Sequence, residues 1–348
     1  MSLPRAALWL LASAWFAAAP ANAGCTEVIV SNEGSGDISI VDPQKLAVVA
    51  SIPVGTRPRG LALSPAGDQL YVALSGTPVG GPGVDESKLP PPDKQADGIG
   101  VIDLAARRLL RVLRGVSDPE RVAVSKDGRR LFVASEDQGK LIAFDLSSGA
   151  ITARAPVGAE AEGVDLTPDG ARIFVTSEAE NHVSVLQAGS LITVAQVPVG
   201  LRPRSTAFSP DGARAYVANE AGGSITEIDT GTLKPTRDMK MPQAGLLPMH
   251  VLVSPDGHML YVSTGRGRHI VALDARNGAV SGTVEAGTRP WGLAISPDGG
   301  ELYSANGPSN DVAVITAAAM QLRGKVRVGE KPWDVICRAP GHTASAGS

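Results

Sequence analysis

A short phrase recurs along this chain: a serine or threonine, in most copies a proline and an aspartate, and a closing glycine, followed by an apolar segment. The gaps between successive closing glycines are 61, 42, 42, 45 and 42 residues. These glycines are Gly67, Gly128, Gly170, Gly212, Gly257 and Gly299. Proline presets φ and glycine accepts a positive φ, so the phrase predicts a tight turn between two strands. A period near 42 residues is the length of one four-stranded propeller blade.

The two ends of the sequence complete one further repeat. Residues 328–337 match the opening of the repeat at 286–295 and then stop. Residues 27–33 match a second strand, 37–42 a third and 47–52 a fourth. A lone blade must pack against neighbours on both faces, and a closed ring leaves only short edges. We therefore predict an all-β fold: a seven-bladed β-propeller of four-stranded antiparallel blades, closed by a C-terminal inner strand that joins three N-terminal strands.

This reading predicts a single domain over residues 24–340, which all-β architectures of this length often form. The split blade comprises 24–53 and 328–339. The complete blades are expected at 54–114, 115–156, 157–198, 199–244, 245–285 and 286–327. Residues 75–97, rich in glycine and proline, are expected to form an inserted loop, either on a binding face or as a surface decoration. Residues 341–348 are expected to be a flexible tail.

The first 23 residues have the composition of a cleaved secretory signal. They contain one charged side chain, Arg5, then a largely apolar stretch over residues 6–19, and end in Ala21-Asn-Ala23. A membrane anchor is the alternative, but about 20 apolar residues are needed to span a bilayer. Lipid attachment at Cys25 is a further alternative. We expect a periplasmic protein with no membrane span after cleavage.

The net charge bears on the class of partner, and the cysteine content bears on disulfide formation. Loss of Arg5 leaves 31 basic residues, from 32, against 35 acidic ones, which argues against a nucleic-acid partner. Cys25 and Cys337 are the two cysteines of the chain. They fall on neighbouring strands of the split blade, and an oxidising compartment would allow them to pair. Two unpaired thiols are the alternative.

The loops that lead into the inner strands carry the most varied side chains. By topology these loops lie at one mouth of the central channel. Arginines and a lysine gathered in a concave mouth would attract an anion, and two tryptophans would offer stacking faces. The candidate ligand-binding residues are Arg57, Arg59, Arg202, Arg204, His250, Arg289, Trp291, Lys331 and Trp333. Alternatively, Glu33, Glu136, Glu178 and Glu220, which reach the same face, neutralise the arginines.

The sequence gives little support for a metal site, a haem site or a catalytic triad. His182 and His269 occupy a slot that other repeats fill with varied polar residues, and one histidine at the mouth, His250, does not make a metal site. We therefore predict no metal. A haem attachment run, a phosphate-binding glycine loop and a Ser-His-Asp order are missing from the sequence. This favours a non-catalytic role and leaves catalysis open.

The strands that follow the turns carry a recognisable pattern. Residues 70–73 read Leu-Tyr-Val-Ala and residues 215–219 read Ala-Tyr-Val-Ala-Asn, and Val-Gly-x-x-Pro precedes several blades. This resembles the YVTN-type β-propeller repeat over most of the chain after Thr26. It most resembles the propellers associated with catabolism dependent on pyrroloquinoline quinone, which implies a link to periplasmic alcohol oxidation and an associated transport system. The sequence departs from that repeat pattern at Tyr303-Ser-Ala-Asn306 and in the insertion.

These observations lead to one main functional hypothesis and two alternatives. The first is a non-catalytic periplasmic binding or scaffold protein, whose basic mouth binds an anionic small molecule or a protein partner of a quinoprotein system. Pyrroloquinoline quinone, a planar tricarboxylate, would suit both arginines and indoles, although no cofactor is firmly predicted. The second is a redox or hydrolytic enzyme with a non-covalent cofactor in the channel and His250 as ligand or base. The third is an envelope protein interaction module.

Overall fold

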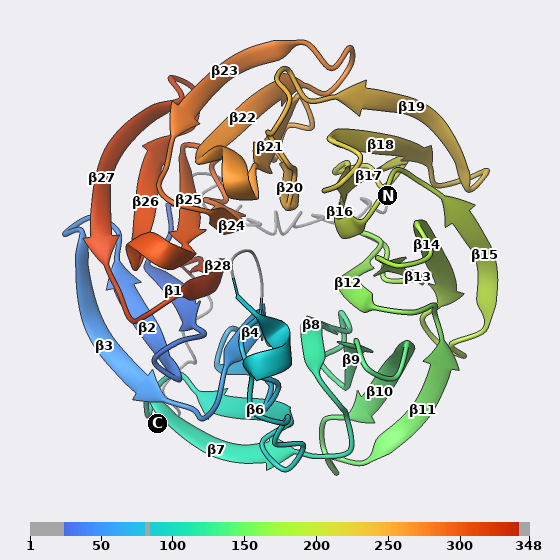
Figure 1. Ribbon diagram of the computed structural model, residues 1–348, viewed down its shortest axis with the longest axis vertical. Helices are drawn as coiled ribbons and strands as arrows, with labels where there is room; N and C mark the ends of the chain where they lie inside the picture. The colour runs from blue at the N-terminus through green and yellow to red at the C-terminus, as the bar shows by residue number, and fades with distance from the viewer. Residues whose placement is uncertain (1–23, 81–83, 341–348) are drawn as a thin grey trace, which may run out of the picture.

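The computed structural model describes residues 24–80 and 84–340. The expected signal peptide at 1–23 and tail at 341–348 lie outside the described residues. Those residues form seven four-stranded antiparallel sheets around a central axis, as Figure 1 shows. This confirms the predicted seven-bladed propeller. No helix within the described part of the chain is long and apolar enough to cross a membrane.

Each blade runs from an inner strand at the channel to an outer strand at the rim. The inner strands are β4 (Pro58–Leu63), β8 (Pro119–Val124), β12 (Ala161–Leu166), β16 (Pro203–Phe208), β20 (His250–Val253), β24 (Pro290–Ile295) and β28 (Pro332–Arg338). The second strands are β5 (Gln69–Leu74), β9 (Arg130–Ser135), β13 (Arg172–Ser177), β17 (Arg214–Asn219), β21 (Met259–Ser263), β25 (Glu301–Asn306) and β1 (Glu27–Asn32).

The outer half of each blade follows the same order. The third strands are β6 (Gly98–Asp103), β10 (Lys140–Asp145), β14 (His182–Gln187), β18 (Ser224–Asp229), β22 (His269–Asp274), β26 (Asp311–Thr316) and β2 (Asp37–Asp42). The outer strands are β7 (Arg108–Leu113), β11 (Ile151–Pro156), β15 (Thr193–Pro198), β19 (Lys234–Lys240), β23 (Val280–Glu285), β27 (Gln321–Arg327) and β3 (Ala47–Pro53). Three short 3-10 turns are η1 (Glu86–Lys88), η2 (Gly265–Gly267) and η3 (Gly307–Ser309).

The ring closes through the split blade, as the sequence predicts. Strand β28 pairs antiparallel with β1, with Glu27 opposite Arg338 and Ser31 opposite Asp334. The backbone N–H of Thr26 extends this pairing by donating to the carbonyl of Arg338 at 2.8 Å. Cys25, which precedes β1, and Cys337 of β28 form a disulfide with their Cα atoms 5.5 Å apart. The predicted bond is thus confirmed, and it holds the two ends of the chain together.

The recurring turn phrase acts through side-chain hydrogen bonds as well as backbone geometry. In one copy the Ser209 hydroxyl donates to Asp211 at 2.6 Å and accepts from the N–H of Arg214 at 3.0 Å. Gly212 lies in the left-handed region with φ 71°. A Cβ at Gly212 would lie 3.5 Å from Cδ of Pro168 in the preceding blade. The phrase therefore shapes the turn and places the prolines between adjacent blades.

The core lies between neighbouring blades and not inside one of them. Phe132 of β9 packs in one apolar cluster with Val164 and Ile173 of the next blade. Tyr71 of β5 likewise packs with Phe144 of β10. Because each sheet buries both faces against its neighbours, the blades form a rigid ring that fixes the inner-strand side chains around the channel.

Candidate functional site

A cavity of about 530 Å³ lies at the channel mouth where the inner strands begin. Seven of the nine predicted site residues line it. They are Arg57, Arg59, Arg202, Arg204, Arg289, Trp291 and Trp333. Three of these arginines, Arg57, Arg202 and Arg289, sit just before their inner strands with φ of 48°, 58° and 57°. The remaining two predictions need correction, because His250 lines a second cavity and the exposed Lys331 lines neither.

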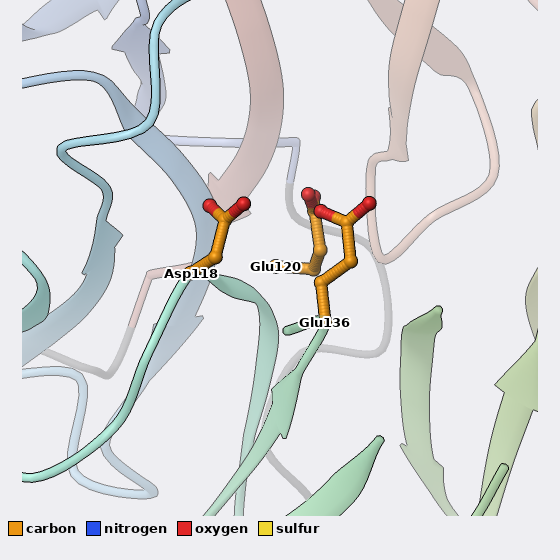
Figure 2. A group of neighbouring side chains, drawn as sticks. All are labelled: Asp118, Glu120 and Glu136. Atoms are coloured by element: carbon orange, nitrogen blue, oxygen red, sulfur yellow. The ribbon is translucent and has the colours of Figure 1, made fainter. Parts of the chain in front are cut away.

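Arg59 is enclosed by carboxylates from the next blade. Its guanidinium forms ion pairs with Asp118 and Glu120, and Glu136 lies 3.9 Å away. Figure 2 shows the three side chains pointing the same way, Glu120 from β8 and Asp118 and Glu136 from the loops beside β8 and β9. They place one oxygen each within 4.8 Å of one another. Arg59 is only 2% exposed, so this group is a buried ion-pair cluster in which the guanidinium already supplies positive charge.

Arg204 is the centre of a second cluster of ion pairs. It contacts Glu162 at 3.3 Å and Glu220 at 2.7 Å, and it also pairs with Glu178. On the same side, Arg202 donates to Glu178 at 2.6 Å. Arg57 donates in the same way to Glu33 at 2.6 Å.

These pairings correct the expectation of a basic mouth. Four of its arginines, Arg57, Arg59, Arg202 and Arg204, are matched by carboxylates, as the alternative interpretation of the sequence anticipated. The physical reason is burial: a guanidinium removed from water is stable only with a partner. The mouth is therefore lined largely by arginines and carboxylates that pair with each other.

Arg289 differs from the other mouth arginines. Within the described residues its guanidinium has no ion pair or side-chain hydrogen bond, and it lies over the ring of Trp291 at 4.6 Å. Burial lowers the pKa of Arg289 from its ordinary value. Trp291 in turn lies beside Trp333, with ring centroids 5.7 Å apart and planes tilted by 31°. This side of the cavity can hold an anion against an aromatic surface.

Glu136 is the mouth carboxyl best placed to exchange a proton near neutral pH. Burial, followed by the charge of Glu162, raises its pKa to about 7. Burial and Glu162 also raise the pKa of Glu178, against the pull of two arginines. Glu136 keeps a partly exposed side chain and lines the cavity, so it can act as an acid or base on a bound molecule.

The insertion between β5 and β6 forms one wall of the cavity. Residues 77–80 and 89–92 line it, and Figure 1 shows the described parts of this segment beside β4 at the centre of the ring. Arg57 donates to the carbonyl of Thr77 at 2.9 Å. Buried Asp97 accepts from the N–H groups of Gly76 at 2.7 Å and Asp118 at 3.0 Å. The base of the insertion is thus fixed to the ion-paired wall.

A second cavity of about 330 Å³ lies along the inner strands and shares no lining residue with the first. Its polar lining residues are Arg121, Asp165, His250 and Asp334. The sequence interpretation placed only His250 at a site and missed the other three. Two of these, Arg121 and Asp334, could have been found by aligning the inner strands, because they share one repeat position with His250 and with Gly60, Gly163 and Gly292. Asp165 lies two residues beyond that position.

One family model matches part of the chain. The model of the family described as Lactonase, 7-bladed beta-propeller, matches residues 156–328, just under half of the chain. No curated protein matches the chain. The matched segment is thus similar to lactonase-type propellers, while the narrower resemblance to YVTN and quinone-associated propellers stays a prediction.

Solved structures share the fold at low identity. A protein of Bacteroides uniformis, named a putative 6-phosphogluconolactonase, is 19% identical with a TM-score of 0.71, covering 89% of this chain and 98% of that one. A Bacteroides fragilis protein of the same name is 18% identical, with a TM-score of 0.69 and coverage of 91% and 99%. Hydrazine synthase of Kuenenia stuttgartiensis is 17% identical, with a TM-score of 0.68 and coverage of 80% and 89%. At these identities the likeness shows the fold alone.

Proposed function

We propose that this protein hydrolyses a small lactone that carries an anionic group, in the cavity at the channel mouth. The observation that carries the proposal is a carboxyl with a pKa of about 7, Glu136, in the same cavity as the guanidinium of Arg289, which has no ion pair among the described residues. The match to a lactonase propeller model and the names of the two Bacteroides proteins support the reaction class.

The proposed step uses the side chains of the cavity as a base and an anchor. Ionised Glu136 removes a proton from a water molecule, whose oxygen forms a bond to the lactone carbonyl carbon. The acyl C–O bond of the ring then breaks, and the proton held by Glu136 passes to the released ring oxygen, giving a hydroxy acid. Arg289 binds the anionic group of the substrate, and Trp291 supports the ring.

A hydrolysis assay tests this function. We expect 6-phosphogluconolactone to open faster than the blank rate, with kcat/KM rising through a pKa of about 7 as Glu136 ionises. Glu136→Gln should lower kcat by about 100-fold or more. Arg289→Ala should raise KM for this substrate but not for neutral δ-valerolactone. Glu160→Gln makes the same charge change at an exposed position and serves as the matched control.

Two results would count against hydrolysis. One is a wild-type protein that opens neither lactone above the blank rate. The other is full activity in Glu136→Gln, because Glu178, the other carboxyl lining the described cavity whose pKa is raised, is buried.

The paired tryptophans support a second candidate function: non-catalytic binding of a planar anion such as pyrroloquinoline quinone, as an accessory to periplasmic quinone-dependent alcohol oxidation and transport. Trp291 and Trp333 would hold the ring and Arg289 a carboxylate. The disulfide is typical of an oxidising compartment, which supports export. Calorimetry with the quinone would favour this candidate if binding is saturable, is lost in Arg289→Ala, and occurs without lactone hydrolysis.

A further inference from the structure

The second cavity combines apolar walls with a small polar group in the channel. Leu61, Leu252, Leu293 and Ile336 are among its apolar lining residues. Its volume of about 330 Å³ is at the lower end of the range for ligand sites. It shares no lining residue with the mouth cavity, so it can be filled independently.

Two of its charged side chains form an ion pair. Arg121 donates to Oδ2 of Asp334 at 3.2 Å, and the same oxygen accepts from the N–H of Leu61 at 3.1 Å. The guanidinium of Arg121 also lies 4.9 Å from the ring centre of Trp333. The remaining oxygen of Asp334 is buried against Gly292, so this ion pair forms a fixed wall of the cavity.

Asp165 is the carboxylate without a counter-ion. Among the described residues it accepts one printed hydrogen bond, from the N–H of Thr206 at 3.3 Å, and no basic side chain lies within ion-pair distance. Burial raises its pKa to about 6, the more distant charge of Arg121 opposes that rise, and the charge of Asp334 adds to it. At neutral pH the cavity therefore carries one uncompensated negative charge.

His250 supplies a hydrogen-bond donor to the same cavity. The backbone N–H of Leu293 donates to its Nδ1 at 3.0 Å, so in the neutral ring the proton sits on Nε2. Burial, followed by the charge of Arg121, lowers the pKa of His250 well below its ordinary value, which keeps the ring neutral. A protonated Nε2 donates a hydrogen bond and does not offer a lone pair to a metal.

We propose that this cavity binds a small aliphatic ammonium ion that carries a hydrogen-bond acceptor, such as a short amino alcohol. The ammonium group pairs with Asp165, the hydroxyl oxygen accepts from Nε2 of His250, and the alkyl chain contacts Leu252 and Leu293. The ligand supplies the missing counter-ion, and a buried charge gains most from such a partner.

Calorimetry on the full chain tests the site with 4-amino-1-butanol as the probe. We expect saturable 1:1 binding of 4-amino-1-butanol at pH 7. The affinity for 1,4-butanediol, which lacks the charge, should be lower by about tenfold or more. Asp165→Asn should weaken binding of the amine about tenfold or more. Glu160→Gln, an exposed change of equal charge in the same blade, should leave it unaltered.

Two further measurements separate a binding role from a structural one. His250→Asn keeps an acceptor for the N–H of Leu293 and removes the Nε2 donor. It should abolish the preference for 4-amino-1-butanol over butylamine and leave butylamine binding intact. Without any substitution, binding should weaken about tenfold from pH 7 to pH 5 as Asp165 protonates. The other charged or titratable groups that line the cavity are Arg121, Asp334 and His250, and burial holds the pKa of His250 well below its ordinary value.

The proposal is overturned if wild-type protein shows no saturable heat with the amine at millimolar concentration, or if the diol binds equally well. Unchanged binding in Asp165→Asn would also overturn it. Arg289→Ala should retain amine binding, so failure of the mouth hypothesis and failure of this one are distinguishable.

Discussion

The disulfide that joins the two ends of the chain offers the sharpest test of how the ring is held closed. Cys25 and Cys337 are 312 residues apart in sequence, and their bond lies beside the pairing of β1 with β28. Cross-linking a loop of that length removes about 6 kcal/mol of conformational entropy from the unfolded chain in the loop-closure model. Replacing both cysteines by alanine should therefore lower the free energy of unfolding by up to about 6 kcal/mol.

The expected change in melting temperature follows from the size of the domain. An unfolding entropy of about 0.7 kcal/mol/K for a ring of this size converts that loss to a decrease of about 9 °C. Denaturant titration and calorimetry would measure both quantities. Reduced wild-type protein is the matched control, because it loses the bond but keeps both sulfur atoms in the core cluster around Val28 and Val335. A loss below about 1 kcal/mol in both samples would show that strand pairing alone closes the ring.

Two further predictions concern buried charge. Asp165→Asn should stabilise the protein at pH 7 by up to about 3 kcal/mol in denaturant titration: the folded pKa of Asp165 is about 6, above its unfolded value, so its stabilising protonated form is lost as pH rises through 6. The gain should vanish below pH 4, and a gain that persists there would refute the reasoning. Arg204→Met should lower the free energy of unfolding by about 3–5 kcal/mol, because three carboxylates lose their shared cation. Arg202→Met, at a side chain 47% exposed, should cost under about 1 kcal/mol, and equal losses in the two variants would contradict this assignment.

The fold was predictable because each repeat has the same pattern of turn and strand residues. The serine and glycine of each turn fix one hairpin, as Ser209 and Gly212 show, and the strand pattern between turns repeats seven times. The split blade could be predicted because residues 328–337 match an inner strand that lacks its partners. Spacing alone placed Cys25 and Cys337 on neighbouring strands, although only coordinates show that their Cα atoms are close enough to bond.

The electrostatics of the mouth could not be predicted to the same degree. The sequence places Arg59 and Arg204 at the mouth, but whether an arginine is free depends on which carboxylates of the neighbouring blades reach it. Asp118 and Glu120 reach Arg59, and Glu178 reaches Arg204, whereas Arg289 rests on Trp291. Pairing across blades depends on distances between residues that are far apart in sequence. Such distances cannot be derived from the composition of the chain.

The repeat position that lines the middle of the channel shows where function can enter such a ring. At this position Gly60, Gly163 and Gly292 lie against the inner strand of the next blade, and a Cβ on Gly292 would lie 2.7 Å from Cα of Asp334. The ring is too narrow at this level for a large side chain on every blade, so each glycine makes room for a neighbour. Arg121 and Asp334 occupy two of these spaces and form the ion pair that leaves Asp165 as the only carboxylate of the second cavity without a cation among the described residues. The glycine thus recurs at this position for steric reasons. In the blades that lack it, the residue at this position has a side chain that can line the channel.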